Sequence, residues 1–379
     1  MIRRVPFLVF AFFVAGWSPL TAADHPTLPL GSPLPDFRLP GVDGRDYTPA
    51  DFAHADVLAI VFTSNHCPTA QLYEERLKQL ATDYRDRSVA LVAINPNHAD
   101  AVRLDEMGFT DLDDTFESMQ ERARHRGYNF PYLDDGPTET FARQLGPVAT
   151  PHVFIFDRAR RLRYQGRIDD SERPDLVKHR DARAAIDALL AGKEPAVTQT
   201  KVFGCSTKWS DKTGDNHRWR EKVAKEPVKL EPAGVEALRA LRANRDSGKV
   251  RLINVWATWC GPCVAEFDEL IEQNLRFRHR DFELVTVAAQ FPDEQPRVLK
   301  FLQQHHASTR NLIFATTEKY ALLEALDPEW NGALPHTLLV APNGAVIYRQ
   351  TGALDFLALR RALLPALDAI APWPATGGE

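Results

Sequence analysis

Cysteine is scarce in this chain, and a long apolar run occurs only at its start. The 379 residues include 4 cysteines, which are Cys67, Cys205, Cys260 and Cys263. A large exported protein held together by structural disulfides carries more cysteine than this. The shortage argues against a disulfide scaffold and indicates that the closely spaced Cys260 and Cys263 serve a chemical role.

An excess of charge of one sign is also missing. The formal net charge is −5, so the chain as a whole has no attraction to nucleic acid or to anionic lipid. The sequence has no glycine-rich phosphate loop, no Ser-His-Asp arrangement and no carboxylates at metal-binding spacing. We therefore expect no nucleic-acid partner, no metal site and no cofactor.

The first residues have the features of a signal peptide. Arg3 and Arg4 precede an apolar run from Val5 to Trp17, and small residues at Thr21-Ala22-Ala23 suit cleavage before Asp24. The run is short for a permanent membrane helix, and no later segment has the length and polarity of a span. We expect residues 1–23 to be removed on export to the periplasm or another extracytoplasmic space, leaving no stable span. A retained N-terminal membrane anchor is the alternative.

The two halves of the chain repeat one pattern. In the first half, the apolar run 57–63 leads to Ser64-Asn65-His66-Cys67-Pro68 and then to a helical pattern with Leu72, Leu77, Leu80 and Tyr84 on one face. In the second half, the run 251–257 leads to Thr258-Trp259-Cys260-Gly261-Pro262-Cys263 and a helical pattern with Phe267, Leu270 and Ile271 toward the core. Each half thus delivers a cysteine from a buried strand to the start of a helix.

The repeat continues downstream of these helices. Further strands are predicted near 89–95, 152–156 and 162–166 in the first half, and near 282–289, 336–340 and 345–349 in the second; helices close the halves at 182–190 and 354–367. This order predicts an α/β fold in which each half has a mixed central sheet flanked by helices.

These patterns set the expected domain boundaries. We predict domains at residues 30–193 and 230–371, a connector without regular structure at 194–229 that contains Cys205, and a disordered tail at 372–379. The acidic cluster Asp111–Asp114 is expected to cap a helix that begins near Thr115.

The pair Cys260 and Cys263 is the strongest chemical signal. Unpaired N–H groups and the dipole at a helix start stabilise a thiolate on the first cysteine, which is the nucleophile of disulfide exchange. The second cysteine, one turn on, attacks the mixed disulfide and releases the reduced substrate. A structural disulfide would close a loop too short to stabilise much, and a zinc site lacks two further ligands at suitable spacing.

The stretch Trp256–Cys263, with Leu334-Pro335 further on, resembles the thioredoxin fold and, more narrowly, the TlpA/ResA-like thiol–disulfide oxidoreductases. The resemblance implies that Pro335 is cis and that Trp259, Leu334 and Pro335 contact the substrate. Asn254 stands where thioredoxin has a buried acid, so the usual proton acceptor is missing. Glu266, one turn after Cys263, is a candidate replacement, and a solvated helix glutamate is the alternative.

The dipeptide between the cysteines bears on the direction of electron flow. Gly261-Pro262 resembles thioredoxin, a reductant. Together with export, this implies that protein disulfides are the substrates and that a membrane thiol reductase is the electron donor.

The first half resembles the redoxin branch of the same fold, close to peroxiredoxin-like proteins. The matching stretches are 64–68, 129–133, 150–151, 166–170 and 204–206. By the same analogy, Thr150 and Pro151 are substrate-binding candidates beside Cys67. Two departures stand out: Ala70 occupies the place of a second active-site cysteine, and Ile60 that of a peroxiredoxin proline.

Three interpretations of Cys67 remain open. It is a peroxidatic thiolate, a redox partner of Cys205, or an inert buried thiol in a domain that binds partners. His66 and His152 are candidates to tune Cys67 or to join it in a metal site, although a histidine beside such a site is more often a satisfied polar group.

Three functions follow for the whole chain. The first is an extracytoplasmic oxidoreductase that reduces protein disulfides at Cys260 and Cys263. The second is a thiol peroxidase in which Cys67 reduces peroxide and the C-terminal pair recycles it. The third is a binding protein without catalysis.

Overall fold

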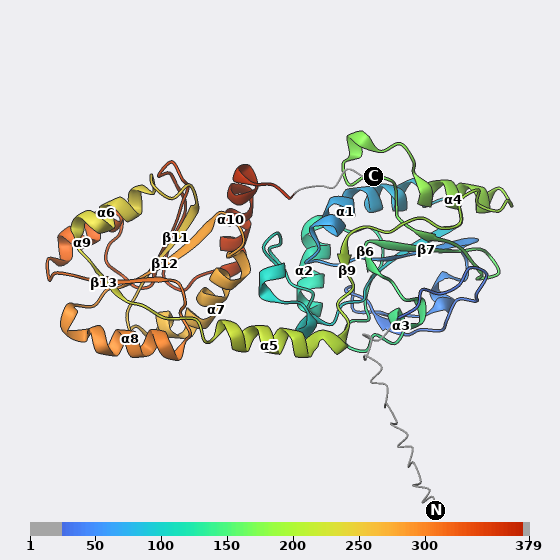
Figure 1. Cartoon of the computed structure of the whole chain (residues 1–379). Coiled ribbons are helices and arrows are strands. Elements are labelled where there is room, and N and C mark those ends of the chain that lie inside the picture. The colour runs from blue at the N-terminus through green and yellow to red at the C-terminus, as the bar shows by residue number, and fades with distance from the viewer. Residues whose placement is uncertain (1–24, 374–379) are drawn as a thin grey trace, which may run out of the picture.

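The chain folds into two α/β domains that are joined by an ordered segment (Figure 1). The computed structural model describes residues 25–373. The predicted signal peptide and the tail beyond Trp373 lie outside these residues. Within them, no helix is both long and apolar enough to cross a membrane.

The first domain is built on a five-stranded sheet of order β5-β4-β3-β7-β8. Its strands β3, β4 and β5 run parallel, and β7 and β8 are antiparallel to their neighbours. Its elements are β1 (Leu39–Pro40), β2 (Asp46–Tyr47), β3 (Val57–Phe62), α1 (Pro68–Asp83), β4 (Val89–Asn95), α2 (Phe116–Arg126), β5 (Tyr132–Asp134), α3 (Ala142–Leu145), β6 (Ala149–Thr150), β7 (His152–Phe156), β8 (Leu162–Gly166) and α4 (Asp181–Leu190).

The joining segment contains β9 (Cys205–Ser206) and α5 (Thr213–Val223). The second domain is built on a six-stranded sheet of order β10-β13-β12-β11-β14-β15. Its elements are β10 (Glu231–Ala233), α6 (Val235–Ala243), β11 (Val250–Trp256), α7 (Gly261–Phe277), β12 (Phe282–Ala288), α8 (Gln295–Gln304), β13 (Arg310–Phe314), α9 (Lys319–Leu326), β14 (His336–Val340), β15 (Val346–Thr351) and α10 (Phe356–Ile370).

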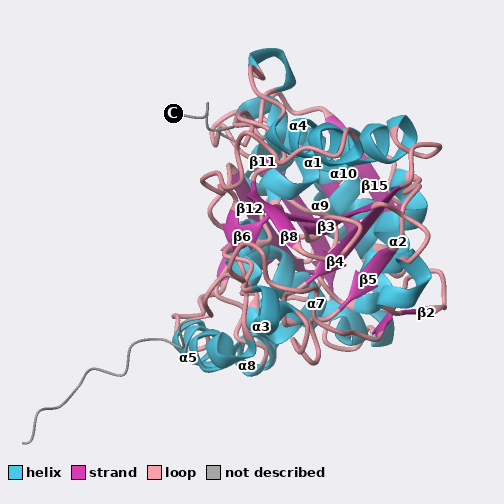
Figure 2. Cartoon of the chain, turned by 90° about the vertical axis from the view of Figure 1, so that its right-hand side faces the viewer, coloured by secondary structure: helices cyan, strands magenta, loops and turns pink. Residues whose placement is uncertain are grey.

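Each sheet is covered on both faces, and its central strand is buried along its whole length. Successive side chains of a strand point to opposite faces, so β11 sends Leu252 toward α7, α8 and α10, and Ile253 toward α6 and α9. In the first domain, alternate residues of β3 likewise join two separate clusters, one of which includes α1 and α4. Figure 2 shows the helices of this domain in front of and around its strands. The predicted mixed sheet flanked by helices is confirmed in both halves.

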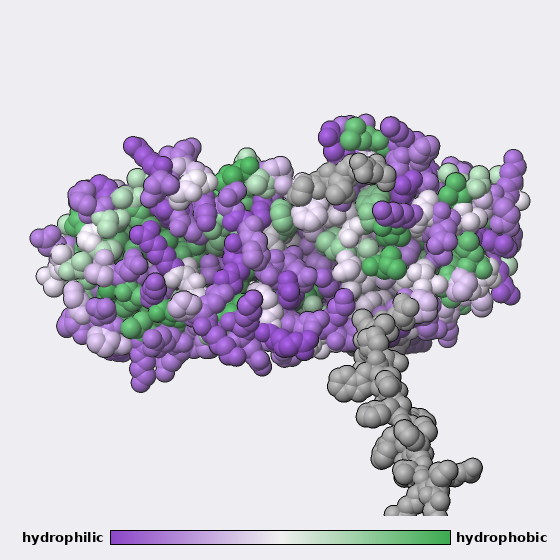
Figure 3. Space-filling view, in the orientation of Figure 1, coloured by the Kyte–Doolittle hydropathy of each residue, from purple (hydrophilic) through white to green (hydrophobic). Residues whose placement is uncertain are grey.

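Two details of the predicted pattern are wrong. Leu72 of α1 is exposed. Tyr73 lies in the core beside Leu77 instead, so the buried face of the helix begins one residue later than predicted. The segment expected to lack regular structure contains α5 and β9. Periodicity did not reveal α5 because most of its side chains are polar, and only Asn216 and Val223 are buried. Hydrophilic side chains cover the strip of surface over α5 in Figure 3.

Asp111 joins the two domains rather than capping a helix. Thr115 is the N-cap of α2, whereas the Asp111 carboxylate accepts hydrogen bonds from Arg122 at 3.0 Å and from Arg361 of α10 at 2.9 Å. The Asp111 carbonyl oxygen accepts a further bond from Arg360 at 2.6 Å. Arg280, just past α7, lies over the ring of Phe109 at 3.9 Å. The end of α7 and the start of α10 are thereby fixed against the first domain.

We expect Asp111→Ala to lower the free energy of unfolding by about 3 kcal/mol, because the substitution leaves the buried Arg122 guanidinium with one carboxylate fewer. Urea unfolding followed by tryptophan fluorescence measures this change. Asp175→Ala is the matched control, since Asp175 pairs with Arg173 on the exposed surface and should matter little. Equal loss in the two variants would show that Asp111 does not hold the domains together.

Candidate functional site

Cys260 and Cys263 form a disulfide at the start of α7, directly after the central strand of the second domain. Cys260 is the N-cap residue of the helix, and the Cys263 backbone N–H donates to Cys260 Sγ at 3.3 Å. Cys260 is 6% exposed and Cys263 is 1% exposed. A substrate therefore meets Cys260 first, and Cys263 lies behind it.

Leu334 and Pro335 lie beside the disulfide because of strand register. His336 of β14 pairs with Val255 of β11, so the preceding residues reach the level at which β11 ends and the loop to Cys260 begins. Leu334 packs against the core cluster that contains both cysteines, and its peptide bond to Pro335 is cis, as the resemblance implied. Trp259, at 62% exposed, stands at the rim of the same site. The residues expected around Cys260 are thus brought together.

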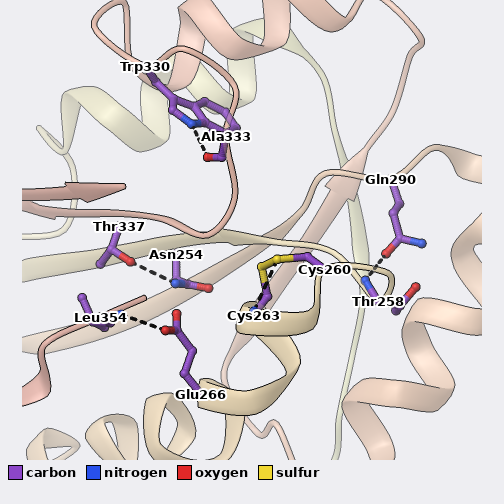
Figure 4. The surroundings of a disulfide bond; sticks show 10 residues. All are labelled: Asn254, Thr258, Cys260, Cys263, Glu266, Gln290, Trp330, Ala333, Thr337 and Leu354. Carbon is purple, nitrogen blue, oxygen red and sulfur yellow. Dashed lines mark hydrogen bonds between the residues drawn. A yellow bond between two sulfur atoms is a disulfide. The ribbon is translucent and has the colours of Figure 1, made fainter. Parts of the chain in front are cut away.

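The polar residues beneath the disulfide are shown in Figure 4. Asn254 is buried and donates to Thr337 Oγ1 at 3.0 Å, so it is satisfied as a neutral group. Glu266 Oε2 accepts from the Leu354 backbone N–H at 2.8 Å, while its buried Oε1 has no partner among the described residues. Burial raises the pKa of the Glu266 carboxyl above its usual range. Glu266 therefore binds a proton more readily than an exposed glutamate does.

Gln290 is a supporting residue that the sequence did not reveal. Its side-chain oxygen accepts a 2.8 Å bond from the Thr258 backbone N–H and so holds the loop before Cys260. Gln290 follows β12, and nothing in the local pattern ties it to a cysteine more than two dozen residues earlier.

Cys67 occupies the equivalent place in the first domain. It is the N-cap of α1, and its sulfur accepts the Ala70 backbone N–H at 3.4 Å. Ser64 and Thr150 meet beside it through a 3.0 Å bond between their hydroxyl groups, and the Thr150–Pro151 peptide is cis. Unlike Cys260, Cys67 is 0% exposed and forms no disulfide.

A buried ion pair adjoins Cys67. His66 Nδ1 lies 2.6 Å from Asp114 Oδ2, and Asn97 donates to the same oxygen at 2.9 Å. Burial alone would lower the pKa of His66, but the charge of Asp114 and its hydrogen bond raise it instead. His152 is different, because burial lowers its pKa to about 3 and its ring accepts a hydrogen bond from the Val148 backbone N–H at 3.3 Å. The tuning role considered for both histidines thus fits His66 alone.

The Cys67 thiol is shifted toward ionisation by these neighbours. Burial by itself would raise its pKa, but a hydrogen bond from the Cys205 side chain, the charge of His66 and the N–H groups of Ala70 and Cys205 together lower it to about 6. The pKa of Cys205 is raised, chiefly because its sulfhydryl donates to Cys67. Sequence reasoning missed Asp114 and Asn97, which approach Cys67 only through the fold.

Among residues 25–373, no group of three or more His, Cys, Asp or Glu side chains is placed to hold a metal ion. The site residues instead form two separate sulfur centres. The carbonyl oxygens of Gly108 and Thr110 accept hydrogen bonds from Arg280 and Arg276. The Thr110 hydroxyl also donates to the Asn65 carbonyl oxygen, so the loop that contains Gly108 and Thr110 adjoins the Cys67 centre. Cys260 lies at the opposite end of α7, about 24 Å along the helix from Arg276.

The comparisons with known proteins agree with two related domains. Residues 30–165 match the AhpC/TSA family and residues 240–359 match the Redoxin family. The thiol:disulfide interchange protein CycY of Rhizobium leguminosarum bv. viciae is 26% identical over 177 residues, which cover 44% of this chain and 89% of CycY. The thiol–disulfide oxidoreductase ResA of Bacillus subtilis is 29% identical over 107 residues, 28% of this chain and 55% of ResA.

Among solved structures, a hypothetical protein from Sinorhizobium meliloti 1021 is 38% identical, with a TM-score of 0.43. The match spans 49% of this chain and 97% of the chain of that protein. The named relatives and the two matched families together support an oxidoreductase. The chain is a tandem of two thioredoxin-like domains, an AhpC/TSA-type domain followed by a Redoxin-type domain, and is related to the thiol–disulfide oxidoreductases.

Proposed function

We propose that the protein is an extracytoplasmic oxidoreductase that reduces protein disulfides at Cys260 and Cys263. The observation that carries this proposal is the Cys260–Cys263 disulfide at the N-terminus of α7, with Cys260 outermost and Leu334, Pro335 and Trp259 around it. The Gly261-Pro262 dipeptide favours reduction as the direction, and the signal-like residues 1–23 favour the location.

The reaction is a two-step exchange. The Cys260 thiolate attacks one sulfur of a substrate disulfide, forms a mixed disulfide and expels the other substrate sulfur as a thiolate. Cys263 then loses its proton and attacks Cys260 Sγ, which releases the second substrate thiol and forms the disulfide seen in the structure. A membrane thiol reductase is the donor we propose for returning both cysteines to thiols.

Glu266 is the proposed acceptor of the Cys263 proton. It lies one helical turn after Cys263, and its raised pKa brings its proton affinity closer to that of a thiol. The carboxyl is held by the Leu354 backbone, so it stays at the base of the disulfide. Asn254 cannot serve in its place because a neutral amide does not accept a proton in this range.

Cys260→Ser should abolish the acceleration that the protein gives to insulin reduction by dithiothreitol, because a serine hydroxyl cannot form the mixed disulfide. Cys263→Ser should instead trap that mixed disulfide, visible as a stable adduct by mass spectrometry. Cys67→Ser is the control and should reduce insulin at the normal rate. Retained reduction in Cys260→Ser would contradict the proposal.

Glu266→Gln should slow release of the mixed disulfide by roughly 10²-fold at pH 6 and by less at pH 9, where Cys263 ionises without help. Stopped-flow measurement of the second step, with pH as the variable, tests this expectation. Glu269→Gln, one further turn along α7 and paired with Arg360, is the matched control. A loss that does not vary with pH would mean that Glu266 acts only in packing.

A second candidate function is reduction of small hydroperoxides by Cys67. The observation that favours it is the lowered pKa of Cys67, about 6, at the start of α1. Because Cys260 lies at the far end of α7, the C-terminal pair of the same copy cannot return Cys67 to its thiol. A second copy of the chain or an external thiol would do so.

Hydroperoxide consumption by a Cys260→Ser/Cys263→Ser variant, with dithiothreitol as reductant, should vanish on adding Cys67→Ser. Since the pKa lies below the ordinary 9.0, the thiolate persists on acidification until about pH 6 and is lost below it. The rate should therefore be nearly level from pH 8 to 7 and fall toward pH 5. A rate that instead rises steadily up to pH 9 would point to a Cys67 with an ordinary pKa.

A further inference from the structure

The chain covers one edge of its own first domain with β9. In the antiparallel pair β6–β9, Thr150 lies opposite Cys205 and Ala149 lies opposite Ser206. Gly204 allows this approach, because a Cβ at this position would lie 2.1 Å from the Thr150 carbonyl oxygen. The Thr207 hydroxyl donates to the Pro147 carbonyl oxygen at 2.7 Å and fixes the other end of the pair.

The second domain has no such cover. Leu334 occupies the place of Thr150 before a cis-proline, but within residues 25–373 no strand pairs with it. A free backbone edge of this kind can take up an added strand from another chain. In the first domain that place is already filled, and the strand that fills it carries a cysteine.

Cys205 is held directly against Cys67 by this pairing. Its backbone N–H donates to Cys67 Sγ at 3.4 Å, and its sulfhydryl is a hydrogen-bond donor to the same sulfur. Both cysteines are free thiols in the structure. Cys67 is fully buried, whereas Cys205 is partly exposed, so a reagent in solution reaches Cys205 first.

The surroundings stabilise a negative charge on this pair of sulfurs. The buried His66–Asp114 ion pair lies next to Cys67, and His66 Nε2 has no partner within the described residues. The Ala70 N–H at the start of α1 donates to the Cys67 sulfur, whereas on another side the Cys67 sulfhydryl donates to the Thr150 carbonyl oxygen at 3.2 Å. A sulfur that accepts hydrogen bonds from a thiol and from backbone N–H groups is stabilised as a thiolate, which is the species that attacks in disulfide exchange.

We propose that Cys67 and Cys205 are a second dithiol–disulfide couple, formed by the first domain and the joining segment, with β9 occupying the place of a substrate strand. This proposal does not rest on the function proposed above, because it needs neither Cys260 nor Cys263.

The oxidant is a small disulfide, with glutathione disulfide as the probe. The two sulfurs share one proton; when it resides on Cys67, the Cys205 thiolate attacks glutathione disulfide, forms a mixed disulfide and releases one glutathione thiolate. Cys67 then ionises and attacks Cys205 Sγ, forming the Cys67–Cys205 bond and releasing the second glutathione. Two protein sulfurs are oxidised and one glutathione disulfide is reduced; the single proton of the pair leaves with one glutathione, and the other glutathione leaves as the thiolate and takes its proton from water.

The full chain with Cys260→Ser and Cys263→Ser isolates this couple. The protein is incubated with glutathione disulfide, quenched in acid, alkylated and digested, and its peptides are measured by mass spectrometry. We expect most molecules to carry a Cys67–Cys205 cross-link that dithiothreitol removes. Glutathione retained on Cys205 without a cross-link, or two alkylated thiols, would overturn the proposal.

Moving the thiol by one residue provides the matched control. Neighbouring residues of a strand point to opposite sides, so Cys205→Ser/Ser206→Cys presents a thiol away from Cys67. In the same background, this variant should keep glutathione on residue 206 and cross-link at least 10-fold less. Equal cross-linking would show that β9 does not select Cys205, and the proposal would fail.

The folding of the variants is checked separately. Cys67→Ser and Cys205→Ser/Ser206→Cys, each with Cys260 and Cys263 intact, should reduce insulin as the unaltered chain does. This readout separates the two proposals: a missing cross-link with normal insulin reduction overturns the couple alone, and lost insulin reduction in Cys260→Ser with a normal cross-link leaves the couple standing.

Discussion

The structure depends on one recurring interaction, in which a cysteine sulfur meets backbone N–H groups where a central strand gives way to a helix. Cys67 accepts the Ala70 N–H and Cys260 accepts the Cys263 N–H, each as the N-cap of its helix. The preceding strands β3 and β11 are buried along their whole length, so each sulfur is carried to the edge of an apolar sheet. The buried strand fixes the position of the cysteine, and the helix N-terminus stabilises its thiolate. Each domain therefore has a sulfur in a position that favours reaction.

What surrounds the sulfur then separates the two domains. At Cys260, the helix supplies a second cysteine and the edge at Leu334 is free, so the site is open to another chain. At Cys67, Ala70 replaces that second cysteine, and β9 brings Cys205 across the edge instead. Under the two proposals, the same local geometry serves an external substrate in one domain and an internal partner in the other.

The sequence was most informative where the chemistry is local. The strands around both cysteines, the helix starts and the second-domain residues Leu334 and Pro335 could be predicted, because apolar runs and short motifs encode them. The role of Asp114 could not be predicted, because its contact with His66 joins residues 48 positions apart. Cys205 was one of the partners that the sequence offered for Cys67, but the sequence could not single it out, because the two cysteines lie 138 positions apart and the polar composition of the joining segment hid both β9 and α5.

The contact between the domains decides what each sulfur centre can meet. Asp111 accepts hydrogen bonds from Arg360 and Arg361 of α10. The Gly108 carbonyl oxygen accepts one from Arg280, just past α7, so the first domain contacts the end of α7 that is remote from Cys260. Cys260 consequently lies at the other end of α7, about 24 Å along the helix from Arg276, which contacts the first domain. Disulfide exchange requires sulfur atoms to come into direct contact, so electrons cannot pass between the two centres of one copy in this arrangement. The contacts of Asp111 with α10 thus keep the two sulfur centres apart, although one chain carries both.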